Sequence, residues 1–250
     1  MKTRSVRVPI LYYHRVDEGL HPTKGVSPSA FAEQMRWLSI RGYQTISFRE
    51  LAAFFDEQGV LPPKPVMVTF DDGYLDNYRV AAPILKQNGL TATIFLVSDF
   101  IGERSSWISD PDQVVPLMNR DQVRELHKEG FSFGSHTCRH SCLVRVPPES
   151  AREEIFRSKQ DIENVLQAEV DGFCYPYGDY DESSVEMVRD AGYKAARVVH
   201  TDNRHAKKDL FTLHCVKVNG AIKLLKFAYY LTEWYHLESW RERRRKGCAS

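Results

Sequence analysis

The stretch VMVTFDDG, residues 66–73, joins a short strand-like run to two carboxylates and a glycine. A nearly continuous apolar run of this length is typical of a strand that is buried on both faces of a parallel sheet. Similar runs occur at residues 8–13, 91–97, 131–134 and 172–175. Because longer segments separate these runs, the sequence predicts parallel strands that are covered by helices.

The segments between the runs have helical character. Residues 47–50 form a capping box, Ser27 followed by Pro28 is a typical helix start, and residues 148–166 form one long amphipathic segment. Four helices are expected to end at a glycine, because glycine most easily adopts the left-handed conformation that closes a helix. These glycines are Gly42, Gly89, Gly130 and Gly192. The alternation predicts one α/β domain, built either as a (β/α) barrel or as a doubly wound sheet.

The overall composition excludes several classes of protein. With 34 Lys and Arg against 33 Asp and Glu, the chain has a formal net charge of +1, which argues against a general nucleic-acid partner. Five cysteines are too few for a disulfide framework and fit a reducing compartment. The apolar run at residues 6–13 is too short and interrupted for a signal peptide, and no stretch approaches the ~20 apolar residues of a membrane span. We therefore expect a cytoplasmic protein without a spanning helix.

Polar residues follow several predicted strands at the point where each strand ends. In both candidate folds, functional side chains gather at the C-terminal ends of the parallel strands. His136 and His140, together with one carboxylate of Asp71–Asp72, make a three-ligand set that leaves open positions on a divalent ion. The second carboxylate could act as a base toward water at that ion. His14 and the turn Pro176–Gly178 follow two other strands in the same way.

Simpler interpretations compete with this one. Asp-Asp-Gly and Pro-Tyr-Gly are common turn sequences, and one His-x-x-x-His pair is weak support for a metal site. Cys138 and Cys142 lie among the histidines and raise the alternative of a closed structural zinc site. That alternative is disfavoured, because closed sites usually pair more distant ligand clusters and this one would leave two aspartates unused.

Three of these segments together resemble the first three motifs of the polysaccharide deacetylases, the NodB-homology carbohydrate esterases. The segments are TFDDG at residues 69–73, SHTCRH at 135–140 and FCYPYG at 173–178, in the family's order and spacing. The resemblance extends from about Pro9 to about Val218. The YYHRV segment at residues 12–16 and the Tyr-Pro-Tyr-Gly form are similar to the branch that includes poly-N-acetylglucosamine deacetylases.

The resemblance implies a distorted (β/α) barrel of about seven strands. It implies a hydrolase that removes N-acetyl groups from an amino sugar, in a polysaccharide or a glycolipid precursor. Asp72, His136 and His140 would bind a divalent metal ion, often zinc, and Asp71 would be the base that activates water. The backbone N–H of Tyr177 would stabilise the oxyanion together with the metal. The residues expected to contact the substrate are His14, Pro176 and Tyr177.

Three features depart from the family's pattern. The third motif often begins with an arginine that braces the catalytic aspartate, and Phe173 stands at that position here. The fourth motif, with Asp and Trp, is missing, since residues 195–203 contain no Trp. The fifth motif, which carries the catalytic acid, is at best shifted to Leu213–His214. The candidates for the acid are therefore, in order of preference, His214, His200 and His14.

Two other functions remain open. The first is the same chemistry on a non-sugar amide, because the motifs specify the reaction centre and not the pocket around it. The second is a non-catalytic carbohydrate-binding homologue, which the unclear acid allows. The intact set of two aspartates and two histidines argues against the second.

Two further segments bear on the site. The loop at residues 102–119, which carries Trp107, is expected to cover it. We assign residues 1–220 to the deacetylase domain and residues 221–250 to an amphipathic helix, running from Ile222 to Trp240, with a basic tail. We expect this helix to close the barrel. In the alternative, its aromatic residues and the basic tail rest on the anionic inner surface of a membrane.

Overall fold

The computed structural model describes residues 5–198, 204–206, 210–232 and 235. The strands of its main sheet are parallel, and eight of them follow one another across the sheet. In order they are β12 (Leu213–His214), β10 (Ala195–Val198), β9 (Gly172–Cys174), β8 (Ser132–Ser135), β7 (Thr93–Leu96), β6 (Pro65–Phe70), β2 (Ile10–Tyr13) and β13 (Val216–Lys217). A ninth strand, β5 (Gln44–Thr45), pairs with the first residues of β6.

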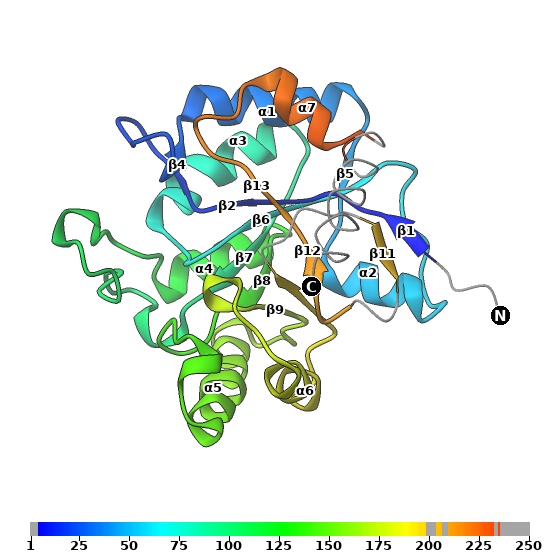
Figure 1. The fold of residues 1–250 in the computed structure, drawn as a ribbon. Helices are drawn as coiled ribbons and strands as arrows, with labels where there is room; N and C mark the ends of the chain where they lie inside the picture. Colours follow the sequence, from blue (N-terminus) through cyan, green and yellow to red (C-terminus); the bar gives the residue numbers. More distant parts are fainter. Residues whose placement is uncertain (1–4, 199–203, 207–209, 233–234, 236–250) are drawn as a thin grey trace, which may run out of the picture.

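The two strands at the ends of this order are consecutive in the chain. Only Cys215 separates β12 from β13, and β12 pairs with β10 while β13 pairs with β2. One segment, residues 213–217, therefore joins the two edges of the sheet. Together with six other strands it closes the sheet into a barrel (Figure 1). The predicted distorted (β/α) barrel of about seven strands is confirmed.

Helices cover the outside of the barrel. On one side α1 (Pro28–Ile40) packs between α3 (Ala82–Gln87) and α7 (Leu224–Tyr230), and on the other α5 (Pro148–Leu166) packs between α4 (Arg120–Lys128) and α6 (Glu182–Asp190) (Figure 1). The helix α2 (Phe48–Phe55) turns Phe48, Leu51 and Phe55 into the barrel interior. Two short pairs complete the described strands: β1 (Ser5–Arg7) with β11 (Arg204–Ala206), antiparallel, and β3 (Arg15–Val16) with β4 (Gly25–Val26), parallel.

The local sequence signals act as expected. Ser47 and Glu50 form the capping box of α2, and the Ser27 hydroxyl caps α1 ahead of Pro28. The four glycines predicted to end helices all have positive φ, between 67° and 92°. The strands predicted from apolar runs correspond to β2, β6, β7, β8 and β9. The short strands β10, β12 and β13 lie outside these apolar runs.

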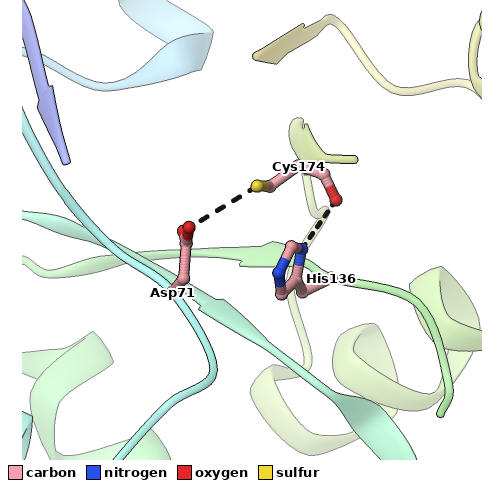
Figure 2. A group of neighbouring side chains, drawn as sticks. All are labelled: Asp71, His136 and Cys174. Carbon is pink, nitrogen blue, oxygen red and sulfur yellow. Dashed lines mark hydrogen bonds between the residues drawn. The ribbon is translucent and has the colours of Figure 1, made fainter. Parts of the chain in front are cut away.

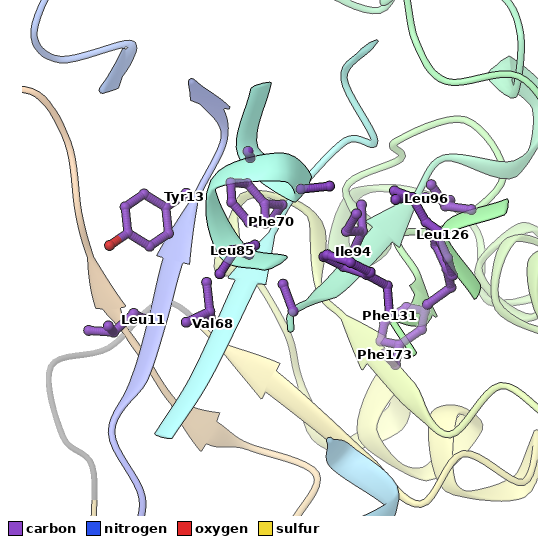
Figure 3. Close-up of a cluster of buried hydrophobic side chains, with 14 of the residues drawn as sticks. Leu11, Tyr13, Val68, Phe70, Leu85, Ile94, Leu96, Leu126, Phe131 and Phe173 are labelled. Atoms are coloured by element: carbon purple, nitrogen blue, oxygen red, sulfur yellow. The ribbon is translucent and has the colours of Figure 1, made fainter. Parts of the chain in front are cut away.

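Strand alternation divides the core into an outer and an inner cluster. Leu11 and Tyr13 of β2 face the helices, where they join the larger cluster that Figure 3 shows. Ile10 and Tyr12 face the barrel interior. The same alternation sends Arg197 of β10 inward, since its neighbours Ala196 and Val198 belong to the outer cluster. The interior thus becomes polar toward the C-terminal ends of the strands.

The predicted C-terminal helix is interrupted within the described residues. α7 ends at Tyr230, because the Leu231 N–H turns back to the Ala228 carbonyl (3.2 Å) and the Thr232 hydroxyl donates to the Tyr229 carbonyl (2.7 Å). Phe227 and Leu231 are buried, and Phe227 meets Trp37 of α1 edge to face.

This part of the apolar face is therefore used against the barrel. Residues 233–234 and 236–250, with Trp234, Trp240 and the basic tail, lie outside the described residues. Membrane contact, the cytoplasmic location and the domain boundary at residue 220 stay predictions. None of the described helices is long and apolar enough to cross a membrane.

Candidate active site

A pocket of about 570 Å³ opens at the C-terminal ends of the strands. It is lined by six residues that the sequence singles out, which arrive from four different strand ends. They are His14, Asp71, Asp72, His136, His140 and Tyr177. Trp107, Ile108 and Ser109 also line it, which confirms that the 102–119 loop covers the site.

Asp72, His136 and His140 form a compact donor group. Asp72 Oδ1 lies 3.4 Å from His140 Nε2 and 3.7 Å from His136 Nε2. Donors that bind one zinc ion tetrahedrally at about 2.0–2.2 Å are roughly 3.3–3.6 Å apart. Asp72 Oδ1 is buried and has no hydrogen-bond partner among the described residues. A buried carboxylate oxygen without a partner is costly, so the observed group fits a metal ion in both spacing and chemistry.

The tautomer of His136 is fixed by a backbone contact. Its Nδ1 lies 2.8 Å from the Cys174 carbonyl oxygen, which can only accept, so Nδ1 carries the proton and Nε2 presents a lone pair (Figure 2). Burial, with a smaller contribution from His140, lowers the pKa of His136 to about 3. Burial also lowers the pKa of His140. Both imidazoles are therefore neutral near pH 7, as metal ligands must be.

The pKa of Asp72 reflects opposing influences. Burial alone would raise it, but the three nearby imidazoles, which attract the carboxylate when they are protonated, and a hydrogen bond from the Tyr74 hydroxyl lower it below its ordinary value. The carboxylate is therefore ionised at neutral pH and ready to bind a cation.

The backbone that carries these groups is unusual. Asp72, Thr137, His140 and Tyr177 all have positive φ, between 60° and 72°, although none is glycine. Such conformations cost of order 1–3 kcal/mol each and gather at functional sites, where the surroundings enforce them. Four of the six non-glycine residues with positive φ in the described chain lie here.

Glu154 holds the turn that carries His136 and His140. Its buried carboxylate accepts from the backbone N–H groups of Cys138 and Arg139, both at 2.9 Å, and from the Arg139 side chain. Glu154 lies on α5, so the long helix fixes the turn from outside the barrel. The Cys138 thiol points to the Glu154 carbonyl, and neither Cys138 nor Cys142 joins the Asp72 group.

Asp71 lies beside the donor group but has partners of its own. Its carboxylate is ion-paired with the Arg197 guanidinium, and its Oδ1 lies 3.8 Å from Cys174 Sγ (Figure 2). Asp71, His136 and Cys174 also offer three ligand atoms within 4.8 Å of one another. Burial holds the pKa of the Cys174 thiol well above its ordinary value, and a protonated thiol is a poor metal ligand. The Asp72 group is therefore the better metal site.

One expectation about the third motif is wrong. Phe173 does not occupy a position that could brace Asp71, because it faces outward into the helix-side cluster. The inward residue of β9 is its neighbour Cys174. In the sheet register Cys174 is opposite Arg197 of β10, so the guanidinium reaches Asp71 from the adjacent strand.

The remaining predicted residues are placed as follows. His14 lines the pocket, and burial lowers its pKa to about 4 against the opposing influence of the Asp72 carboxylate. His214 is not among the pocket-lining residues of the described chain, and His200 lies outside the described residues. Pro176 is buried beneath the turn, where its ring fixes the backbone, and only Tyr177 and Gly178 of that turn reach the pocket.

Sequence reasoning placed Trp107 and Tyr177 at the site but did not predict how their rings contact His140, and it missed Lys217 and Arg197. Trp107 stacks on His140 with ring centres 5.3 Å apart, and Tyr177 meets the same imidazole edge to face at 4.7 Å. Lys217, at the end of β13, lines the pocket beside His14. The alternation Ala196–Arg197–Val198 was the one available signal for an inward-facing arginine.

Comparisons with known proteins agree with this geometry. A family model described as polysaccharide deacetylase matches residues 58–196. The Bacillus subtilis protein YxkH, named for a polysaccharide deacetylase, is 30% identical over 230 residues, which cover 91% of this chain and 77% of that protein. A poly-beta-1,6-N-acetyl-D-glucosamine N-deacetylase of Staphylococcus aureus is 24% identical over 68% of this chain, which spans 59% of that relative's length.

Solved structures share the fold. The Streptococcus pyogenes deacetylase PplD, in complex with acetate, has a TM-score of 0.79 at 23% identity and covers 92% of this chain and 100% of its own. IcaB from Ammonifex degensii has a TM-score of 0.75 at 23% identity and covers 90% of this chain and 97% of its own.

Proposed function

Because this chain belongs to the polysaccharide deacetylase family, we propose that it hydrolyses N-acetyl groups of an amino sugar, in a polysaccharide or a glycolipid precursor. One observation carries the proposal. A buried three-donor group and a separate carboxylate, Asp71, share one open pocket. This is the arrangement that metal-assisted hydrolysis of an amide requires, with one set of residues for the ion and one base for the water.

Deacetylases of this family depend on a metal ion. Asp72, His136 and His140 would hold it here, and the unpartnered Asp72 Oδ1 supports this assignment. Two imidazoles and one carboxylate favour zinc, which we propose as the ion. When bound, the ion supplies a Lewis acid that polarises the acetyl carbonyl and lowers the pKa of water in the pocket.

Asp71 is proposed to carry the proton of the attacking water. Its carboxylate is 3% exposed and lies outside the Asp72 group, so it can act as a base toward water in the pocket. Once protonated, the same group can return the proton to the departing amine. Water is then added across the amide bond, its OH to the acetyl carbon and its H to the nitrogen, without net gain or loss of a proton.

His14 is better suited to substrate binding than to acid catalysis. Burial lowers its pKa to about 4, so the imidazole is neutral near pH 7 and can accept a hydrogen bond from a sugar hydroxyl. The acid role first assigned to His214 stays a prediction.

Tyr177 is proposed to act through its backbone and its ring. Tyr177 is 62% exposed at the pocket rim. Its φ of 62° is not helical, so the backbone of the turn after β9 departs from a regular helix at this residue. We assign its N–H to the oxyanion that develops on the acetyl oxygen. Together with Trp107, which also contacts His140, its ring offers an aromatic wall for the apolar face of a sugar.

The groove extends beyond the acetyl site. A second pocket of about 260 Å³ shares His14, Tyr74, Ile108 and Lys217 with the first and continues toward Lys24. The continuity supports a substrate longer than one sugar, with the reacting residue between the aromatic wall and the basic end.

The test is acetate release from N-acetylglucosamine oligomers of increasing length by the purified chain. We expect release that a chelator abolishes and added zinc restores. Asp71→Asn should keep its metal but lower turnover by roughly 10²-fold or more. A fully metal-loaded, folded protein that releases no acetate from any oligomer would contradict the proposal.

A further inference from the structure

The smaller pocket of about 260 Å³, called the side pocket from here on, contains charges that the proposed reaction does not use. Lys24 and Lys217 both line it, and neither ammonium is ion-paired with a carboxylate of the described residues. Arg15 lines it as well, but Asp17 and Asp76 each accept from its guanidinium at 2.8 Å. In this part of the described chain, the cations that remain available to a ligand are the two lysines.

The two lysines stand on loops that backbone contacts lock together. Lys24 comes directly before β4, and Lys217 is the last residue of β13. The Gly220 N–H, shortly after Lys217, lies 2.8 Å from both the Pro22 and the Gly25 carbonyl oxygens. A Cβ at Gly220 would stand 2.9 Å from the Gly25 oxygen, so the two loops approach as closely as only glycine allows. The fold therefore sets the relative position of the two lysine backbones.

The charged side chains around the side pocket are mainly of one sign. Asp112 is the one carboxylate among its described lining residues, and it is exposed to solvent. Two ammonium groups that share so small a pocket repel each other, and a cleft lined by charge of one sign attracts ligands of the opposite charge. Lysine is a common phosphate ligand, because its ammonium acts as a point charge. The side pocket therefore suits a phosphate group.

The side pocket can be reached by the molecule that reacts in the active-site pocket. The two pockets share His14, Tyr74 and Ile108, and Lys217 lines both. A sugar whose acetyl group lies beside the metal-binding donors therefore directs its other substituents, or the next sugar, toward the two lysines.

We propose that the side pocket binds a phosphate group carried by the sugar that is deacetylated or by its neighbour in the substrate. Lys24 and Lys217 bind this group, and Asp112 opposes its binding. A phosphate substituent of a polysaccharide and the diphosphate of a lipid-linked precursor present the same chemistry, and the test distinguishes them. The proposal rests on the proposed deacetylase function, but binding in the side pocket can be measured without turnover.

The experiment measures kcat/KM of the metal-loaded protein for acetate release from matched neutral and phosphorylated substrates. One set is an N-acetylglucosamine trimer, unmodified or with a phosphate ester at either end. The other is N-acetylglucosamine joined to a short prenyl chain, directly or through a diphosphate. At low salt we expect a preference of about 2- to 25-fold for a phosphorylated substrate, since each of two exposed ion pairs contributes a factor of about 1.4 to 5. The preference should disappear near about 1 M salt, where the screening length is about 3 Å.

Variants assign this preference to the side pocket. The quantity compared is the ratio of kcat/KM for a phosphorylated substrate to that for its neutral counterpart. Lys24→Met and Lys217→Met should each lower this ratio by a factor of about 1.4 to 5, and the double variant should bring it to about one. Asp112→Asn removes an opposing charge and should raise the ratio by a similar factor. Lys64→Met, at an exposed lysine beside the start of β6, is the control and should leave the ratio unchanged.

Calorimetric titration with the phosphorylated trimers gives a readout that needs no turnover, and the affinity should fall in the double lysine variant. A preference for the trimer phosphate or for the prenyl diphosphate supports the proposal and identifies the source of the phosphate. If wild type releases acetate without preferring any phosphorylated substrate, or if the double variant keeps the preference, the proposal is wrong and the deacetylase function stands. If no substrate releases acetate, the deacetylase function fails, while an affinity that the lysine variants leave unchanged would refute the side pocket on its own.

Discussion

The barrel divides into a first arc, from β6 to β9, and a second arc, from β10 to β13, and the two arcs position the pocket residues by different means. From β6 to β9, the donors stand on turns with left-handed backbone that hydrogen bonds enforce, as Glu154 does for the turn between His136 and His140. From β10 to β13, the contribution is charge: Arg197 inside the barrel and Lys217 at the pocket rim. A metal site needs donors fixed within a few tenths of an ångström, which backbone geometry provides. A base and a substrate need orientation, which charge can provide over longer distances.

The largest effect is expected from removing a donor in the first arc. His136→Ala removes an imidazole whose tautomer is fixed by the hydrogen bond to the Cys174 carbonyl. The two donors that remain should not retain the ion. We expect loss of stoichiometric metal, by elemental analysis, together with loss of detectable acetate release. The exposed His21→Ala is the control and should change neither. Full metal content in His136→Ala would remove this residue from the donor group.

A smaller effect is expected from loosening the turn without touching a donor. Glu154→Gln replaces one acceptor oxygen with an amide NH₂ that faces the N–H groups of Cys138 and Arg139. Metal affinity, measured by calorimetric titration, should fall about 10- to 100-fold. Glu153→Gln, one residue earlier on the same helix and more than half exposed, should bind metal normally. Equal affinity in both variants would mean that the turn holds its donors without Glu154.

The two arcs also differ in what the sequence reveals. β6 to β9 are apolar runs that end in recognisable motifs, so parallel strands and the convergence of Asp71, Asp72, His136 and His140 were predicted from residue order. The choice of a barrel over a doubly wound sheet came from the family resemblance. β12 and β13 have two residues each, too short for any periodic pattern. The pairing of Arg197 with Asp71 joins residues on non-adjacent strands, which spacing in the sequence cannot show. The bracing position of the third motif was wrongly assigned to Phe173, because the assignment used only the position in the motif. It did not take into account that alternate residues of a strand face opposite sides of the sheet, which turns Phe173 toward the helices.

Acid should destabilise the metal-free protein through its buried histidines. Burial lowers the pKa of His14 to about 4 and that of His136 to about 3, below the ordinary value of 6.5. As the pH falls below about 6.5, these histidines bind protons in the unfolded chain but not in the folded chain, so the free energy of unfolding decreases. The loss approaches about 1.4 kcal/mol per pH unit for each histidine and continues until the folded pKa is reached.

Denaturant unfolding of metal-stripped protein between pH 7 and pH 4 measures this loss. His14→Gln should show a shallower slope than wild type, whereas the exposed His21→Gln should keep the wild-type slope. A His14→Gln variant with an unchanged slope would show that His14 binds its proton equally in both states.

The smallest effect is expected at the rim of the second arc. Lys217 lines both pockets of the groove, and its exposed ammonium is screened by solvent, so its interaction with substrate should contribute only about 0.2–1 kcal/mol. Lys217→Met should therefore raise KM by a factor of about 1.4 to 5 and leave kcat unchanged. Lys64→Met, at an exposed lysine beside the start of β6, should leave both constants unchanged. If Lys217→Met lowered kcat more than tenfold at constant KM, Lys217 would act in the transition state, and the contrast between a fixed metal arc and an orienting charged arc would have to be abandoned at this position.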